Sequence, residues 1–427
     1  MSYPKYQLDC GWNALLPKRE AAPALQQDIN VDVAIIGAGW TGISAAKRWR
    51  ELSPTDEIAL LDASEFDEGN AGRNSGFLLP IALAEDARPD QVERMALCNQ
   101  LTGATMQHIV EEVRLSGHDV DLQRAGTYRA AASDAGMQSL NKYRAFLAAA
   151  QLSYEELDGQ ALKERLGTDF YQQGLYSPDC YLAQPAAVIR ALAARLPQDV
   201  QLFENTPALS LKSTAAGWLV TTPAATVTCR KLILANNAFS KDLGIGRSRL
   251  VAMYTFAGIT PRLSDAQLGT LGSESNWGLL PTHRLGSTLR RTSDGRLLIR
   301  SMHGYEKEKS GQQINAELTD RLQRRFPTIA PIRFEQLWGG AVGFTYNGGA
   351  FWGEAKPNLY VSAGCNGGGT VKGTLLGKLL VEKAHGMEVP DVAALFGSAS
   401  WMPPEPFRAI GFHVASTIES WQGRKEL

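Results

Sequence analysis

A short apolar run followed by a glycine-rich turn constrains the fold more than any other feature. The run VDVAIIG starts at Val31, and the turn at Gly37–Gly42 has the spacing GxGxxG. The next segment, TGISAAKRWREL, has apolar residues at helical spacing, and EIALLD then ends on Asp62, 20 residues after Gly42. This order of strand, turn, helix, strand and acid is typical of a βαβ unit that binds a dinucleotide.

Each glycine of the turn has an expected role. Gly37 permits the tight turn, Gly39 lets the backbone approach a pyrophosphate, and Gly42 lets the helix pack closely on the strand. The unpaired N–H groups of the helix N-terminus favour phosphate, and Asp62 can accept hydrogen bonds from a ribose. The alternative is a tight turn that binds no ligand.

The composition excludes several classes of protein. The 427 residues include 43 Lys or Arg and 44 Asp or Glu, for a net charge of −1. The chain lacks the excess of basic residues that would indicate nucleic acid as a partner. No apolar run reaches the ~18 residues of a transmembrane segment. The five cysteines lack CxxC spacing and the six histidines lack HxxxH or HxH spacing. We therefore expect no metal site and a reduced, cytoplasmic protein.

Two further segments suit a backbone that contacts a ligand. LYVSAG at 359–364 leads into a glycine-rich turn and the helical segment VKGTLLGKLLVEKA, so both ends of the chain carry a strand, a glycine turn and a helix. The loop Asn70–Gly76, NAGRNSG, follows Asp62 closely and combines small residues with Arg73. It suits close passage along a large ligand, and an ordinary surface turn is the alternative.

Four segments together resemble the FAD-dependent amine and amino-acid oxidoreductases of the D-amino-acid oxidase superfamily. They are DVAIIGAGWTGISAA, NAGRNSGF, KLILANNAFS and LYVSAGCNGGGTVKGTLLGKLLVE, and the resemblance covers about residues 28–385. Within the superfamily, the chain looks most similar to glycine and sarcosine oxidases and gamma-glutamylputrescine oxidase. The resemblance implies FAD as the cofactor.

The expected fold class is α/β. A doubly wound, Rossmann-like FAD-binding domain is joined to a substrate domain built on a mixed, largely antiparallel sheet. We expect the FAD-binding domain to be discontinuous, with residues 1–85, 173–248 and 335–427. The substrate domain then takes residues 86–172 and 249–334. The first 30 residues lack the pattern of a signal peptide and are expected to lie as an arm over the fold.

The resemblance also implies which residues bind FAD. The first turn would meet the pyrophosphate, the acid and its neighbours the adenosine ribose, and the later segments the adenine or the flavin. These residues are Gly37, Gly39, Trp40, Thr41, Gly42, Asp62, Ala63, Ser64, Gly72, Arg73, Asn74, Ser75, Gly76, Ala208, Ala235, Asn236, Gly340, Cys365, Asn366, Gly367, Gly368, Gly369 and Thr370.

The chain departs from the family pattern at three positions. Gly343 stands where monomeric sarcosine oxidases carry the cysteine that links the flavin, so we expect noncovalent FAD. Val371 aligns with the lysine that binds the substrate carboxylate, with Lys372 one residue further, which argues against a sarcosine-like substrate. The stretch Gly295–Ser301 lacks the lysine that faces the flavin in several sarcosine-type oxidases. The sequence therefore leaves open whether O2 or another acceptor takes the electrons.

Four residues on predicted strands of the substrate domain are candidates for the catalytic pocket. They are Tyr254, Arg300, His303 and Trp338. Each also has a structural alternative: Tyr254 and Trp338 as core aromatics, Arg300 as an ion-pair partner, and His303 as a structural histidine.

We therefore predict an enzyme that oxidises a C–N bond of a small amine or amino acid. Hydride would pass to flavin N5, and the imine product would hydrolyse in water. The alternatives are oxidation of a 2-hydroxy acid on the same fold, or a flavin-binding sensor or interaction protein without turnover.

Overall fold

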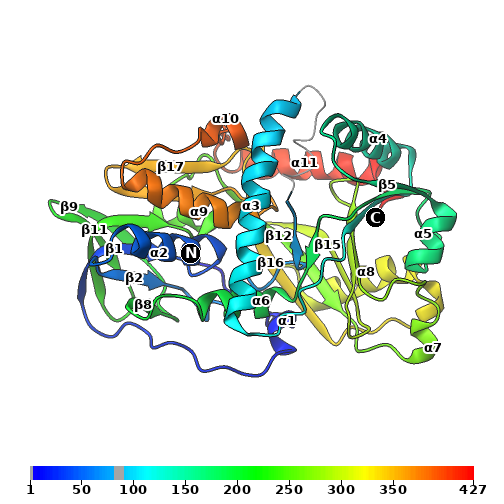
Figure 1. Ribbon diagram of the computed structural model, residues 1–427, viewed down its shortest axis with the longest axis horizontal. Helices are drawn as coiled ribbons and strands as arrows, with labels where there is room; N and C mark the ends of the chain where they lie inside the picture. Colours follow the sequence, from blue (N-terminus) through cyan, green and yellow to red (C-terminus); the bar gives the residue numbers. More distant parts are fainter. Residues whose placement is uncertain (1–2, 81–90) are drawn as a thin grey trace.

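The computed structural model describes residues 3–80 and 91–427. Its described part consists of two halves side by side, each built on an eight-stranded sheet (Figure 1). A two-stranded ribbon of β3 (Phe77–Leu78) and β7 (Tyr181–Leu182) adds to these sheets. The predicted fold class is confirmed.

The first sheet has the apolar strand of the glycine motif near its centre. β1 (Ile29–Ile36) pairs in parallel with β2 (Ile58–Leu61) on one side and β11 (Thr226–Leu234) on the other. Its strand order is β17-β18-β11-β1-β2-β8, with β10 and then β9 attached to β11. The remaining strands of this sheet are β8 (Val200–Phe203), β9 (Ser210–Thr214), β10 (Gly217–Thr221), β17 (Phe351–Lys356) and β18 (Leu359–Ala363).

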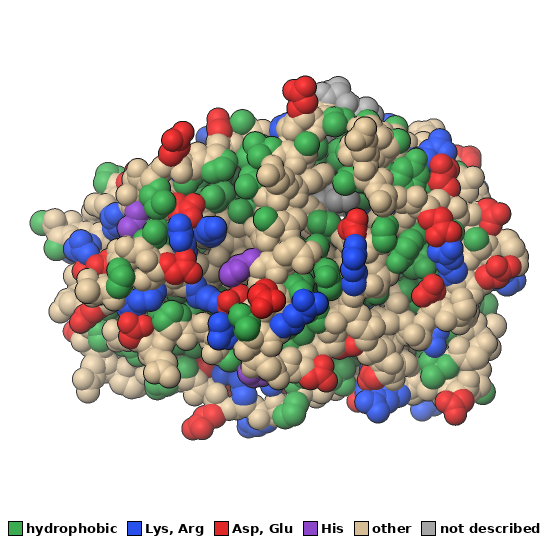
Figure 2. All heavy atoms as spheres, viewed as in Figure 1, with side chains coloured by type: hydrophobic (Ala, Val, Ile, Leu, Met, Phe, Trp, Pro, Cys, Tyr) green, Lys and Arg blue, Asp and Glu red, His purple; other side chains and the backbone are tan. Residues whose placement is uncertain are grey.

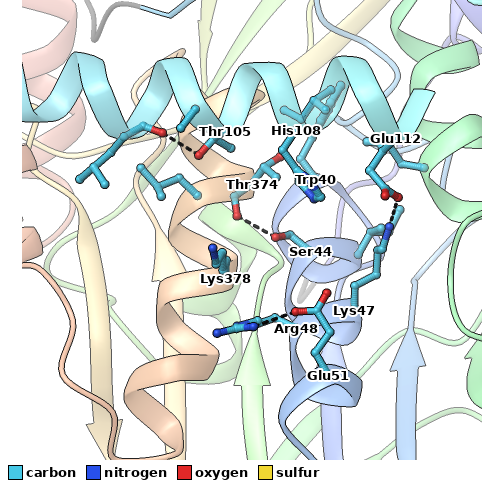
Figure 3. A pocket seen from close by; sticks show the side chains of 16 residues that line it. Trp40, Ser44, Lys47, Arg48, Glu51, Thr105, His108, Glu112, Thr374 and Lys378 are labelled. Carbon is cyan, nitrogen blue, oxygen red and sulfur yellow. Dashed lines mark hydrogen bonds and ion pairs between the residues drawn. The ribbon is translucent and has the colours of Figure 1, made fainter. Parts of the chain in front are cut away.

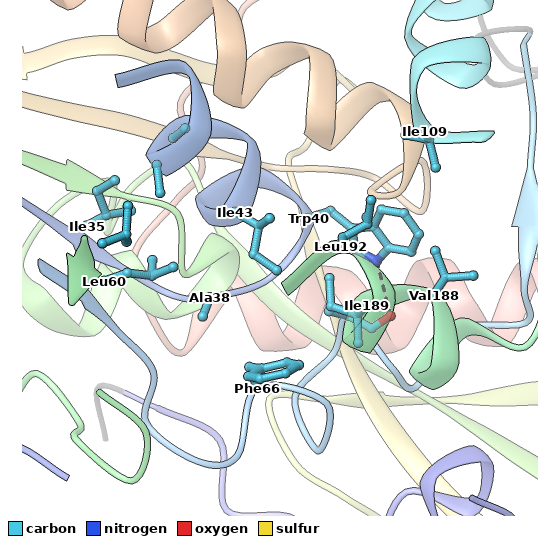
Figure 4. Packing of buried hydrophobic residues seen from close by; sticks show 14 of the residues in the cluster. Ile35, Ala38, Trp40, Ile43, Leu60, Phe66, Ile109, Val188, Ile189 and Leu192 are labelled. Carbon is cyan, nitrogen blue, oxygen red and sulfur yellow. Dashed lines mark hydrogen bonds between the residues drawn. The ribbon is translucent and has the colours of Figure 1, made fainter. Parts of the chain in front are cut away.

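Both faces of β1 are buried, which explains its continuous apolar run. On one face, Val33 and Ile35 pack with α2 (Trp40–Leu52), α6 (Pro185–Ala193), α9 (Val371–Ala384) and α3 (Val92–Ser116). Figure 4 shows Trp40 and Ile43 of α2 in this cluster. On the other face, Ala34 and Ile36 pack with residues of β10, β11 and β18. Such two-sided burial requires apolar residues at successive positions.

The second sheet is mostly antiparallel and has the order β16-β12-β15-β14-β13-β4-β6-β5. β13 pairs in parallel with β4, which makes the sheet mixed. Its strands are β4 (Thr127–Ala131), β5 (Glu155–Asp158), β6 (Gln173–Ser177), β12 (Val251–Ile259), β13 (Trp277–Pro281), β14 (Thr288–Arg291), β15 (Leu297–Tyr305) and β16 (Gln336–Phe344).

The remaining helices lie around the second sheet, between the two halves and near the chain ends. α8 (Gly311–Arg325) contacts β12, β15 and β16, and a Ser310 capping box begins it. The other described helices are α1 (Gly11–Ala14), α4 (Asp134–Ala149), α5 (Gly159–Leu166), η3 (Asn237–Leu243), α7 (Asp265–Leu268), η4 (Pro327–Ile329), α10 (Val392–Phe396) and α11 (Phe407–Gln422). Among the helices that the structure describes, none has the length and apolar content needed to cross a bilayer.

Three elements lie in the other half of the protein from the one that the expected domain boundaries give them. β6 and β16 belong to the second sheet although residues 173–248 and 335–427 were assigned to the FAD-binding domain. α3 packs against α6 and α9 of the first half although 86–172 was assigned to the substrate domain. The chain crosses between the halves near these elements, where composition does not change. The expected boundary at 85/86 lies outside the described residues.

Candidate functional site

A cavity of about 110 Å³ lies where β1, β2 and β11 end. The residues that follow these strands, Gly37, Asp62 and Ala235, line it together. Ligands of open α/β sheets bind at the carboxyl ends of the strands, so this is the expected position of a dinucleotide site. The full lining is Tyr3, Pro4, Ile36, Gly37, Gly39, Asp62, Ala63, Ser64, Phe66, Gly69, Asn70, Ala71, Thr206, Ala208, Ala235, Asn236, Asn237 and Phe239.

The glycine turn leaves its backbone open toward this cavity. Gly37 has φ +102°, a conformation that favours glycine, and a Cβ on Gly42 would overlap the Gly37 carbonyl oxygen. At Gly39 the only close neighbour of an added Cβ would be the Ala71 side chain, at 3.5 Å. No side chain caps α2, whose N-cap is Gly39. The helix N-terminus is therefore available to an anionic group such as a pyrophosphate.

Asp62 is held in place by backbone donors. Its Oδ2 accepts a hydrogen bond from Ala38 N at 2.8 Å, and its Oδ1 accepts one from Ser64 N at 3.1 Å. Burial nevertheless raises the pKa of Asp62, since these donors only partly replace water. The carboxylate lines the cavity and suits the hydroxyl donors of a ribose.

The opposite wall contains a polar atom without a partner. Asn236 Oδ1 is buried and accepts no hydrogen bond from any residue that the structure describes. Asn236 lines the cavity beside Ala235, and Ala208 lines it from the loop before β9. Buried polar atoms are rarely left unsatisfied, so an orphaned acceptor in this wall indicates a ligand with a donor group.

Some expected FAD-binding side chains point away from the cavity. Trp40 is 6% exposed and lies in the core, where its Nε1 donates to Ala71 O at 3.1 Å (Figure 4). The Thr41 Oγ1 faces α9, 3.0 Å from where a Cβ of Gly373 would lie. At both positions, only the backbone is left to meet a phosphate.

The loop Gly72–Gly76 is packed inside the protein. Asn74 Nδ2 donates to Ala71 O at 2.7 Å, and the fully buried Arg290 donates to the carbonyl oxygens of Ser75 and Ala183. The neighbouring residues Gly69, Asn70 and Ala71 line the described cavity instead. The contacts of Gly72–Gly76 with FAD therefore remain a prediction.

The C-terminal glycine loop is organised by Asn366. Its Oδ1 accepts a hydrogen bond from Thr345 N at 2.9 Å, and its Nδ2 donates to Gly348 O and Gly364 O at 2.9 and 2.8 Å. The side chain of Asn366 is thus committed to the loop itself. Downstream, α9 begins at Val371, and the preceding Thr370 makes no side-chain cap, which leaves backbone donors at the helix N-terminus. The rest of the loop comprises Cys365, Gly367, Gly368 and Gly369.

Arg300 lies where the two halves meet. Its Nε donates to Thr255 Oγ1 at 2.7 Å, and its Nη1 donates to Arg73 O at 3.3 Å. Burial lowers its pKa to about 10. Among the described residues, no carboxylate forms an ion pair with Arg300.

Arg73 and Gly340 complete this junction. Arg73 donates to Glu68 O, Leu8 O and Gly339 O at 2.7–2.9 Å, so its guanidinium is fixed inside the protein. A Cβ on Gly340 would lie 3.3 Å from Arg73 Cβ and 3.8 Å from Arg300 Nη2. Gly340 therefore keeps open the space between the two arginines.

The other pocket candidates lie in different surroundings. Trp338 is 1% exposed among apolar side chains and donates to Arg73 O at 3.1 Å, which favours its structural alternative. Tyr254 is buried on β12, and burial raises its pKa to about 12. His303 is partly buried on β15 near Arg321 and Arg300; burial and these cations lower its pKa to about 4, so it is neutral at pH 7.

Tyr6 in the N-terminal arm is a residue of this junction that the sequence did not reveal. Its ring lies over the Arg73 guanidinium at 3.8 Å and edge-on to Tyr254. Its hydroxyl donates to Asn70 Oδ1 and accepts from Ala341 N. Tyr3 and Pro4 of the same arm line the nucleotide cavity. No periodicity marks these residues; two tyrosines in an otherwise polar arm were the only signal.

The surroundings of Gly343 agree with a noncovalent cofactor. A Cβ at this position would overlap the Asn237 side chain, which also accepts from Gly364 N at 3.0 Å. A cysteine here would have to displace a side chain that fixes the glycine loop.

A second cavity, of about 240 Å³, has the features of a surface groove between helices. It lies between α2, α3 and α9, and its rim contains ion pairs of Lys47 with Glu112 and Arg48 with Glu51 (Figure 3). None of its lining residues follows a strand of the first sheet. On the molecular face shown in Figure 2, acidic and basic side chains are intermixed.

An uncapped helix at the end of a parallel sheet, an acid at the end of the neighbouring strand and a second sheet beside them are typical of a dinucleotide-binding protein. The family profile described as FAD dependent oxidoreductase (DAO) matches residues 32–383. The chain belongs to this family, which confirms the expected superfamily and FAD as the cofactor. The uncapped helix, Asp62 and the orphaned Asn236 Oδ1 fit such a group.

Individual relatives are distant but match over most of their length. The chain is 24% identical to a probable oxidoreductase, OrdL, of Rhizobium meliloti over 88% of each chain. It is 24% identical to the gamma-glutamylputrescine oxidoreductase of Escherichia coli, covering 90% of this chain and 89% of the relative. The crystal structure of glycine oxidase from Geobacillus kaustophilus superposes with a TM-score of 0.73 at 19% identity, covering 88% of this chain and all of that one.

Proposed function

We propose that this protein oxidises the C–N bond of a small amine or amino acid that carries an anionic end. The observation that carries the proposal is Arg300, a cation at the junction of the two halves with no acidic partner among the described residues. A buried charge is costly unless it is paired, so an anionic substrate group would remove this cost.

The relatives support the substrate class. One is a gamma-glutamylputrescine oxidoreductase, and a protein with the same fold is a glycine oxidase. Glycine and the gamma-glutamyl group each carry a carboxylate as well as an amino group. The carboxylate suits a site with a fixed guanidinium.

Bound FAD would supply the acceptor for two electrons. This chain's part would be to bind and orient the substrate. Arg300 would hold the anionic end, with Thr255 Oγ1 fixing the direction of the guanidinium. With a pKa of about 4, His303 is neutral at pH 7 and is only a weak base there. Gly340 would leave room for the substrate beside Arg300.

Anaerobic bleaching of the bound flavin tests the proposal. The FAD-loaded protein would be mixed with matched compounds: amino acids, the corresponding 2-hydroxy acids, and alkylamines that lack the carboxylate. We expect bleaching by at least one amine with an anionic end and slower bleaching by its uncharged counterpart. Bleaching by hydroxy acids alone would contradict C–N oxidation, and no bleaching by any compound would favour a sensor without turnover.

We also propose a cytoplasmic location. The structure describes all five cysteines; none of them is in a disulfide, and four are buried. Cysteines outside disulfides are usual in reducing compartments. Fractionation of cells that express the protein at its natural level would test this; recovery with the extracellular fraction would contradict it.

A further inference from the structure

The helix α11 turns its apolar side away from the protein. Phe407, Ile410, Val414, Ile418 and Trp421 are each more than half exposed, and no residue of α11 is buried. In an ordinary surface helix, the apolar side faces the core. The orientation of α11 therefore leaves an apolar stripe, formed by these five residues, without a partner within the described chain.

The inner side of α11 holds this orientation. Arg408 donates to Leu250 O and Arg247 O at 3.1 and 3.0 Å. Phe412 stacks on Tyr305 of β15 with ring centroids 5.1 Å apart. Rotation of the helix to bury the stripe would break these contacts, so the stripe stays uncovered by the residues that the structure describes.

The stripe is symmetric about its centre. Its members follow one another at spacings of 3, 4, 4 and 3 residues, with Val414 in the middle, Ile410 and Ile418 on either side, and aromatic residues at both ends. At about 100° per residue, all five lie within roughly 40° of Val414 around the helix. A second such helix, antiparallel to the first, would oppose isoleucine to isoleucine and Phe407 to Trp421.

We propose that this stripe is an interface with a second copy of the chain, related by a two-fold axis that passes near Val414. Such an interface uses the same surface twice and must be self-complementary, as the symmetric spacing is. Antiparallel packing would also bring exposed Glu405 of one copy near exposed Arg424 of the other, since they lie nine and ten residues from Val414. The positive end of each helix dipole would then lie beside the negative end of the other, which is favourable.

The exposed area is sufficient for such an interface. Trp401 and Tyr346 are 60% and 80% exposed, and hydrogen bonds of Asn347 to Ser398 and Ser400 link their loops. With aromatic side chains of about 150–250 Å² each, these two and the stripe expose on the order of 700 Å², close to the ~800 Å² per partner of a stable interface.

The mass of the FAD-loaded protein in solution tests the proposal. Sedimentation over a concentration series should give twice the chain mass for the wild type. Val414→Glu places two like charges at the axis and should give a monomer with unchanged bound flavin. Leu115→Glu, a change at an equally exposed leucine on α3, is the control and should remain dimeric. A monomeric wild type, or a Val414→Glu dimer of unchanged Kd, would overturn the interface.

Cross-linking tests the antiparallel register separately. Under a mild thiol oxidant, Val414→Cys should form a covalent dimer. Phe407→Cys and Trp421→Cys should cross-link when mixed but not alone. Cross-linking of either end variant with itself would overturn the antiparallel arrangement. A monomer that floats with vesicles of phosphatidylcholine and phosphatidylglycerol would show that a lipid surface covers the stripe instead, and would also overturn the proposal.

Discussion

Gly39 is a residue whose small size matters to the ligand more than to the fold. Its φ of −85° is open to any residue, and an added Cβ makes only an ordinary contact with Ala71. A larger side chain would extend into the nucleotide cavity. We expect Gly39→Leu to fold but to bind FAD more weakly by about 1–3 kcal/mol, roughly fivefold to 150-fold in Kd. Titration of the apoprotein with FAD measures this.

Two control variants distinguish an effect on FAD binding from an effect on folding. Gly103→Leu, at a position on α3 where an added Cβ meets nothing within 4 Å, should keep the wild-type Kd. Gly42→Ala should unfold or destabilise the protein, since its Cβ would overlap the Gly37 carbonyl oxygen. A folded Gly39→Leu protein with wild-type affinity would refute the assignment of the phosphate turn.

Arg300 allows the substrate proposal to be tested at a single side chain. Arg300→Met removes the charge but keeps much of the volume. If Arg300 pairs with an anionic group, the loss should be on the order of 2 kcal/mol, about thirtyfold in kcat/KM for an acidic substrate. Bound flavin should be unchanged. Steady-state kinetics on both proteins decide the question, and an unchanged kcat/KM would make Arg300 a structural cation.

At the scale of elements, the N-terminal arm contributes both to the cavity at the end of the first sheet and to the junction around Arg73. In Figure 1 it runs from α1 along the lower edge to β1. Removal of residues 1–6 takes away Tyr3 and Pro4 from the cavity wall and Tyr6 from the Arg73 guanidinium. We expect the Kd for FAD to rise roughly fivefold to tenfold, the equivalent of about one buried hydrogen bond. Quenching of flavin fluorescence during titration gives the Kd.

Tyr6→Phe is the matched control for this truncation, because it keeps the ring and loses only the hydroxyl. Its effect should be smaller than that of the truncation. An unchanged Kd in the truncated protein would mean that the arm covers the site without contributing to binding.

Elements with a strong local pattern could be predicted from sequence, and elements defined by distant partners could not. The buried strand β1, the glycine turn and Asp62 follow from periodicity and motif spacing alone. The assignment of β6 and β16 to the second sheet depends on pairing with β4 and β12, which no local pattern encodes. For the same reason Tyr6 was missed, since its partners Asn70 and Ala341 lie 64 and 335 residues away.

For the whole molecule, His303 makes stability depend on pH. Its folded pKa is about 4 and its unfolded value is 6.5. Between these values the unfolded chain binds a proton that the folded chain does not, so the free energy of unfolding falls as the pH is lowered. From pH 8 to pH 5 the contribution is about 2 kcal/mol. Denaturant unfolding of wild type and His303→Gln should differ by this amount between the two pH values.

If His303→Gln leaves the pH dependence of unfolding as it is in the wild type, the partial burial of His303 does not lower its pKa in the folded protein.

The strand order of the first sheet has a consequence for protein synthesis. β1, which leads into the glycine turn, leaves the ribosome about 320 residues before β18 and α9. At 5–20 residues per second, this is a delay of roughly 15–60 s. During that time the glycine turn exists without the strand and helix that complete its sheet. We therefore expect the cofactor to bind only after β18 and α9 have been translated, and a nascent chain halted before β18 to remain colourless.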